Sequence, residues 1–197
     1  MYLQVYKLRF TKTCAQALSD AQKMHMLLTE LAENCRASDN LLYRLEYKKE
    51  EPYLFVQTDA LLRENENLEL VMTIDLSEKL AFSEGESIRF SVITSPHAKS
   101  HGKVSYFKTD NLGTAQEKRI HWVQRKLLDY GLEASSIREG RKIETQFFRK
   151  GSGKGTFTSY EYAICGTIRQ AELFGARWHK GFGMHKAYGS GMFLLRR

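Results

Sequence analysis

The sequence lacks the long apolar run that a membrane-spanning helix requires. No stretch of its 197 residues approaches the roughly 20 apolar residues that cross a bilayer. Its start, Met1–Tyr6, alternates polar and apolar residues and does not resemble a signal peptide. Cysteine is scarce: Cys14, Cys35 and Cys165 are odd in number and widely spaced, which argues against a disulfide framework and favours buried thiols. We therefore expect a cytoplasmic protein without membrane contacts.

Signatures of several enzyme classes are also missing. No spacing of His, Cys, Asp and Glu matches a zinc or two-metal site. Neither a Walker phosphate loop nor a Gly-x-Ser-x-Gly elbow is present. The segment Gly151–Gly155 resembles a phosphate loop, but no helix follows it, and we interpret it as the tip of a β-hairpin. These absences favour chemistry without a metal or a cofactor.

Acidic residues are few in the second half of the chain. Residues 1–95 contain 11 Lys and Arg against 15 Asp and Glu, a net charge of −4, whereas residues 96–197 contain 19 against 8, a net charge of +11. Clustered Lys and Arg neutralise phosphates and release condensed counterions, so RNA or DNA is the first candidate partner of the basic half. The alternative is a solvated basic surface that aids solubility.

The first half has the order of elements of a ferredoxin-like unit. We expect strands at 2–9, 41–47, 53–57 and 87–94, and one helix whose apolar stripe runs from Ala17 to Cys35, with Thr13 or Ser19 as its N-cap. Residues 68–76 fit either a strand or a helix. This β-α-β-β-β order is typical of ferredoxin-like or RRM-like domains.

A second unit of the same kind follows a polar connector at 95–113. We expect helices at 116–130 and 170–179, strands at 141–148 and 156–168, and a last strand after the glycine-rich segment. The predicted fold class is therefore α+β, with two tandem ferredoxin-like domains at 1–95 and 96–197. Two such sheets that face each other would leave a cleft between them.

The glycine-rich segment Gly181–Gly191 is the most distinctive part of the chain. Its four glycines allow positive φ angles, and Lys186 adds a positive charge among them. Because a predicted helix precedes it, the segment suits a phosphate of a nucleotide or of a nucleic-acid backbone. Equally, the glycines could only permit a tight turn from helix to strand.

His25 and the basic hairpin are the candidates for chemistry and for RNA binding. His25 follows Met24, a residue of the apolar stripe, so it lies about 100° further round the helix, at the margin of the buried face. Histidine titrates near neutral pH and suits proton transfer in RNA cleavage through the 2′-OH, although a histidine on a helix flank is commonly an ordinary surface residue. Arg149, Lys150 and Lys154 flank the hairpin tip and could contact an RNA groove, or could belong to a solvated turn.

Together these residues resemble the CasE family of CRISPR-associated endoribonucleases, which process precursor CRISPR RNA in type I-E systems. The resemblance covers nearly the whole chain. It rests on the Met1–Leu3 start, His25, Trp122–Leu127, Ala163–Ile168 and Gly181–Met192. The last motif is the specific one, because the family pattern of two Gly-x-Gly groups with a lysine between them is kept.

The resemblance implies a tandem ferredoxin-like fold and a metal-free endoribonuclease. Such enzymes cut the repeat at the base of its stem-loop, leave a 2′,3′-cyclic phosphate and a 5′-OH, and retain the mature CRISPR RNA as a subunit of Cascade. The expected partners are thus the repeat hairpin, the mature CRISPR RNA and other Cascade subunits, and no cofactor is expected. The alternatives are a non-catalytic RNA-hairpin-binding subunit, in which His25 is a spectator, and a nucleotide-binding regulatory protein that uses the glycine loop.

The resemblance also assigns roles to residues. His25 becomes the proton-transfer residue. Family members often have a tyrosine three residues earlier, where this chain has Gln22. Either Lys23 or a hairpin lysine such as Lys154 supplies the electrostatic stabilisation instead, or turnover is slow. The residues predicted to bind RNA are Lys99, Lys103, Lys108, Arg141, Lys142, Arg149, Lys150, Lys154, Gly183, His185 and Lys186.

Overall fold

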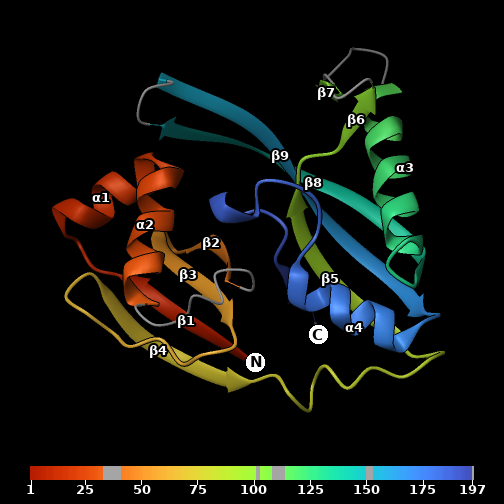
Figure 1. The fold of residues 1–197 in the computed structure, drawn as a ribbon, viewed down its shortest axis with the longest axis horizontal. Coiled ribbons are helices and arrows are strands. Elements are labelled where there is room, and N and C mark those ends of the chain that lie inside the picture. The colour runs from red at the N-terminus through yellow and green to blue at the C-terminus, as the bar shows by residue number, and fades with distance from the viewer. Residues whose placement is uncertain (33–40, 101–102, 108–113, 150–152, 197) are drawn as a thin grey trace.

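The computed structural model describes residues 1–32, 41–100, 103–107, 114–149 and 153–196. Two four-stranded antiparallel sheets form two domains, each with its own buried apolar core (Figure 1). Both sheets have the strand order of the ferredoxin-like fold, so the predicted fold class is confirmed.

The first domain contains the sheet β2-β3-β1-β4. Its elements are β1 (Tyr2–Leu8), α1 (Lys12–Ser19), α2 (Ala21–Leu31), β2 (Leu42–Lys48), β3 (Glu51–Thr58) and β4 (Leu68–Asp75). Alternate apolar residues of the strands, such as Tyr6, Leu54 and Val56, pack against the buried face of the two helices. The ambiguous stretch at 68–76 is therefore a strand, and it occupies the sheet edge next to β1.

The second domain contains the sheet β10-β5-β9-β8 and a small two-stranded sheet. Its elements are β5 (Ser87–Thr94), β6 (His97–Ser100), β7 (Lys103–Tyr106), α3 (Thr114–Leu128), β8 (Leu132–Arg149), β9 (Gly153–Ile168), α4 (Ala171–Lys180), the short 3₁₀ helix η2 (Lys186–Tyr188) and β10 (Phe193–Leu195). An aromatic core that includes Phe90, Phe174 and Trp178 joins α4 to the sheet.

Three expectations differ from the structure. β5 is found at the predicted residues but pairs with β9 and β10, so a division at residue 95 would separate it from its own sheet. The single helix expected in the first domain is two helices, because the side chain of Asp20 caps α2 by accepting from Gln22 N at 3.0 Å, while Thr11 caps α1. The expected connector at 95–113 contains the β6–β7 hairpin.

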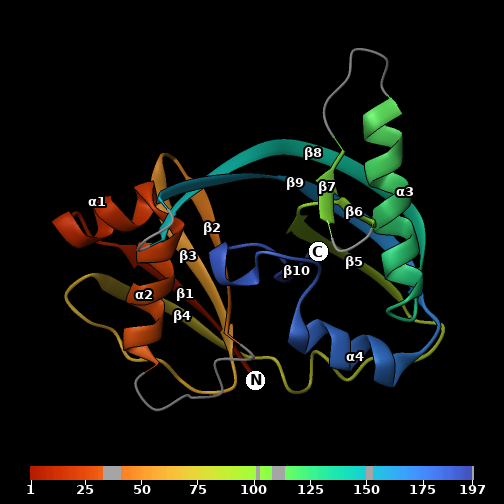
Figure 2. The same ribbon diagram turned by 45° about the horizontal axis from the view of Figure 1, so that its top comes forward.

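The long β8–β9 hairpin extends from the second domain to the N-terminal end of α2 in the first (Figures 1 and 2). Its base contributes to an ion cluster in which Arg44 of β2, fully buried, pairs with Glu46 and with Glu161 of β9. Arg141 of β8 pairs with the same two carboxylates, at 2.8 Å and 3.1 Å. The helix-free faces of the two sheets thus meet through charged side chains at this point.

Burial raises the pKa of Glu161, but Arg44, Arg141 and Arg196 outweigh that effect and hold its pKa below the ordinary value. Arg44 also donates to Ser91 of β5, at 3.0 Å. The cluster therefore connects β2 of the first domain with three elements of the second, and it holds the base of the hairpin in a defined position.

Candidate active site and RNA interface

Asp20 joins the hairpin to the start of α2. Its Oδ1 accepts from the backbone N–H of Gln22 and from that of Phe148 on β8, at 3.0 Å and 3.1 Å. The carboxylate is buried and lies at the helix N-terminus, where a negative charge is stabilised. One side chain thereby fixes the hairpin, which belongs to the second domain, against the helix that carries His25.

His25 is half-buried on α2, at the margin of the packed face as its spacing predicts. Its Nδ1 atom is buried and finds no hydrogen-bond partner in the part of the chain that is described. Burial lowers the pKa of His25 below its ordinary value of 6.5, because a buried imidazolium loses part of its hydration. The neutral imidazole is therefore the favoured form at pH 7, and its Nε2 atom accepts a proton in the tautomer that carries its hydrogen on Nδ1.

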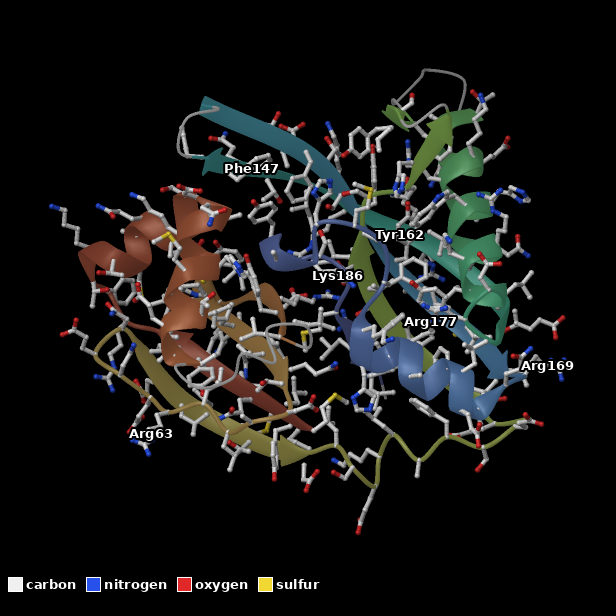
Figure 3. The ribbon with its side chains drawn as sticks, in the orientation of Figure 1. Arg63, Phe147, Tyr162, Arg169, Arg177 and Lys186 are labelled. Carbon is white, nitrogen blue, oxygen red and sulfur yellow. The ribbon has the colours of Figure 1, made fainter. Side chains whose placement is uncertain are left out.

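An aromatic cluster packs the glycine loop against the hairpin. The ring of Tyr188 in η2 stacks on Phe147 of β8, with centroids 5.0 Å apart and planes 10° apart. His185 stacks on Phe157 of β9 at 4.0 Å, and its Nε2 shares a hydrogen bond of 2.9 Å with the hydroxyl of Tyr106. Figure 3 shows Phe147 on the part of the hairpin that approaches the first domain and Lys186 in the loop between the two domains.

Tyr188 also contacts the first domain. Its hydroxyl donates to Gln22 Oε1 at 3.0 Å, across 166 residues of sequence. The phenol further lines a cavity of about 470 Å³ between α1, α2, β2 and β8. Three separate segments, namely α2, the hairpin and η2, therefore meet within one helical turn of His25.

All four glycines of the loop have positive φ, from 72° at Gly181 to 85° at Gly191, as the sequence predicts. A Cβ at Gly183 would lie 2.4 Å from Thr94 Oγ1, and one at Gly191 would lie 2.5 Å from the Phe182 carbonyl oxygen. The N–H groups of Gly181, Phe182 and Gly191 donate to backbone carbonyls inside the protein. These contacts favour the interpretation of the loop as a turn that needs glycine over that of a phosphate cradle.

Lys186 stabilises the end of α4. Its Nζ donates to the carbonyl oxygen of Lys180, the last residue of that helix, at 2.8 Å. A cation at this position also interacts favourably with the helix dipole. The amine remains exposed and keeps two further N–H donors, so a contact with RNA stays a prediction.

The cations predicted at the site have different surroundings. Lys154 lies near the hairpin tip with its Nζ 6.0 Å from the ring centre of Phe148, so the hairpin brings it towards the start of α2. Lys23 donates to Gln16 of α1 at 3.0 Å and points away from His25, since two helical positions correspond to about 200°. Arg141 belongs to the ion cluster, and Lys142 pairs with Glu144 at 2.7 Å.

The remaining predicted cations are only partly described. Lys99, Lys103 and Arg149 lie in strands, but their side chains are outside the described part, and Lys108 and Lys150 lie outside the described residues. Their roles stay predictions. Among the described residues, no three His, Cys, Asp or Glu side chains gather as a metal-binding group. Within the same residues, no helix is long and apolar enough to cross a membrane.

Sequence reasoning missed Asp20, Tyr188 and Arg44. Asp20 had a local signal, since Asp before an apolar-periodic segment is a favoured N-cap. Tyr188 and Arg44 had none, because their partners lie far away in the chain: Gln22 for the first and Glu161 for the second.

The whole chain, residues 1–197, matches the family model described as "CRISPR associated protein". A comparison with curated protein sequences gives no match. Among solved structures, the fold is similar to that of the CRISPR endoribonuclease Cse3 bound to a 19 nt RNA, with a TM-score of 0.85, 19% identity and 100% of both chains covered.

Two further structures share the fold. Thermus thermophilus Cse3 bound to an RNA that represents a pre-cleavage complex has a TM-score of 0.83 and 18% identity, with 100% of this chain and 98% of that chain covered. A chain of a CRISPR RNA-guided surveillance complex has a TM-score of 0.72 and 19% identity, with both chains fully covered. The similarity thus extends over both domains.

Proposed function

Because the chain belongs to the family of CRISPR-associated proteins, we propose that it is an endoribonuclease that processes precursor CRISPR RNA. It cleaves the repeat at the base of a stem-loop without a metal ion and stays bound to the mature CRISPR RNA. The observation that carries the proposal is the position of His25, a neutral, half-buried histidine where α2 meets the basic hairpin. The full-length similarity to Cse3 bound to RNA supports it.

In the proposed reaction the substrate supplies its own nucleophile. Nε2 of neutral His25 takes the proton of the 2′-OH, and the 2′-oxygen attacks the adjacent phosphorus. The bond from phosphorus to the 5′-oxygen breaks, and this oxygen leaves as a 5′-OH after it takes up a proton. The other product ends in a 2′,3′-cyclic phosphate, so no water and no metal-bound hydroxide enters this step.

Retention of the product fits the charge of the second half. Its net charge of +11 and the lysine beside the hairpin tip favour contacts with the phosphates of an RNA stem. A chain of similar fold occurs in a CRISPR RNA-guided surveillance complex. The proposed partners are therefore the repeat hairpin, the mature CRISPR RNA and the other subunits of such a complex.

The test is cleavage of hairpin RNAs that carry CRISPR repeats, with EDTA present throughout. We expect His25→Ala to reduce the cleavage rate by roughly 10²- to 10⁴-fold with RNA affinity nearly unchanged, as for loss of a general acid or base. His121→Ala is the matched control, because His121 is exposed on α3, away from the hairpin tip, and should leave the rate unchanged.

A substrate with a 2′-deoxy nucleotide 5′ of the cut should bind but not be cleaved. Cleavage of that substrate would refute attack by the 2′-OH, and loss of wild-type activity in EDTA would refute metal independence. Tight binding of every hairpin without cleavage would instead indicate a non-catalytic RNA-binding subunit.

A further inference from the structure

We infer that Tyr188 is a second catalytic residue, whose phenol donates a hydrogen bond to the scissile phosphate beside His25. The inference rests on the proposed function. It starts from the hydrogen bond of 3.0 Å between the Tyr188 hydroxyl and Gln22 Oε1. Gln22 and His25 are three positions apart on α2, so their side chains share one face with Cβ atoms about 5–6 Å apart.

The β8–β9 hairpin holds the ring of Tyr188 in place, while α2 contacts its hydroxyl. Its ring lies nearly parallel to that of Phe147, and Phe157 adds a second aromatic contact at 6.1 Å. The backbone of Tyr188 is also held in one conformation. Its N–H donates to the His185 carbonyl, and the next residue, Gly189, has a φ of 82°. The hydroxyl is therefore positioned by packing before any RNA arrives.

The place that the hydroxyl occupies fits a phosphodiester group. A 2′-OH that donates to the His25 imidazole brings its own phosphate within a few ångströms of that ring. The Tyr188 hydroxyl lies on the same face of α2, one turn towards the N-terminus of the helix. An arriving phosphate oxygen takes the place of Gln22 Oε1 as the acceptor, so one neutral hydrogen bond is exchanged for a charge-assisted one.

The chemical role is stabilisation of charge, without a covalent step on tyrosine. As the 2′-oxygen attacks, negative charge grows on the non-bridging oxygens, and a fixed O–H donor stabilises this state more than the ground state. Tyr188 keeps its proton throughout. Lys23 cannot take this role from its observed position, because its amine is bound to Gln16 about 200° around the helix from His25.

Tyr188→Phe tests the inference, because it removes the hydroxyl and leaves the stacked ring. The assay is single-turnover cleavage of a repeat hairpin that the wild-type chain cleaves. We expect the rate to fall by roughly 10²-fold, as when one oxyanion donor is removed, with RNA affinity within about 3-fold of wild type. Tyr53→Phe is the matched control, because it removes a tyrosine hydroxyl that bonds to Glu51 at 3.2 Å in the first sheet.

Gln22→Ala separates catalysis from positioning of the loop. If the Tyr188–Gln22 bond only held the loop to α2, both variants would lose activity equally. The inference instead expects Gln22→Ala to keep the rate within a few fold of wild type. A sulfur in place of a non-bridging oxygen at the cut should slow the wild type more than it slows Tyr188→Phe.

Two outcomes would overturn the inference: a wild-type rate for Tyr188→Phe, or an equal loss for Gln22→Ala. In both cases wild-type cleavage and its loss in His25→Ala would leave the proposed function intact. Failure of the wild-type chain to cleave any repeat hairpin would refute the proposed function and this inference with it. The experiment therefore distinguishes the two failures.

Discussion

Gly191→Ala is expected to destabilise the second domain by more than the cost of placing an alanine at a positive φ angle. Gly191 and Gly85 have nearly the same φ, 85° and 82°. An alanine at such an angle costs about 1–2 kcal/mol in either place. A Cβ at Gly85 would meet nothing within 4 Å, whereas one at Gly191 would lie 2.5 Å from Phe182 O and 3.1 Å from Phe182 N.

These neighbours are backbone atoms that cannot rotate away, and Phe182 N also donates to the Gly191 carbonyl at 2.8 Å. Overpacking of this kind adds about 1–3 kcal/mol. Gly191→Ala should therefore lower the free energy of unfolding by about 2–5 kcal/mol, and Gly85→Ala by about 1–2 kcal/mol. The difference between the variants isolates the contribution of packing.

Urea unfolding followed by tryptophan fluorescence measures this difference. Trp122 and Trp178 both lie in the core of the second domain, so the signal reports on the domain that contains both glycines. Equal shifts of the unfolding midpoint in the two variants would refute the reasoning. The loop would then accommodate a side chain by moving, and its glycines would not define the position of Tyr188.

Two further predictions concern pH and charge. Because burial lowers the pKa of His25, the apparent kcat/KM for cleavage should rise as pH increases, reach half of its maximum below pH 6.5 and stay level above it; a midpoint above 6.5 would contradict a neutral His25 base in the free protein. Replacing Arg149, Lys150 and Lys154 with glutamine should weaken binding of the hairpin RNA and flatten its log–log salt dependence by roughly 0.7–0.9 for each phosphate that the protein no longer neutralises. The matched control replaces Lys48, Lys49 and Lys79 of the acidic half with glutamine. An equal loss of RNA affinity in this control would indicate nonspecific binding over a diffuse surface.

The sequence predicts elements well where the period of the apolar residues is unbroken. β5 is found at the predicted residues 87–94, and α4 differs from its prediction by one residue at each end. β8 begins at Leu132 instead of 141, because register shifts after Ala134 and after Glu139 interrupt its alternation. The apolar stripe continues across Asp20, so periodicity alone could not show that one predicted helix is two.

The sequence predicts those site residues whose position follows from their neighbours in the chain. His25 could be placed on a helix margin from its neighbours, and the glycines of the loop predicted positive φ correctly. The contact of Tyr188 with Gln22 depends on how two domains pack, which no local pattern contains. The same holds for Arg141, which looks like a free cation in the sequence but pairs with two carboxylates in the structure.

The ion cluster at the hairpin base limits how this chain can exchange parts with its relatives. Arg44 and Glu46 come from one domain, whereas Glu161 and Arg141 come from the other, and Arg44 is fully buried among them. A chimera that took only its first domain from a relative without this arginine would remove the fully buried partner of Glu161 and leave it with Arg141 and Arg196, which are more exposed. The two domains are therefore expected to be inherited as a pair, and working chimeras should need both sides of the cluster from one parent.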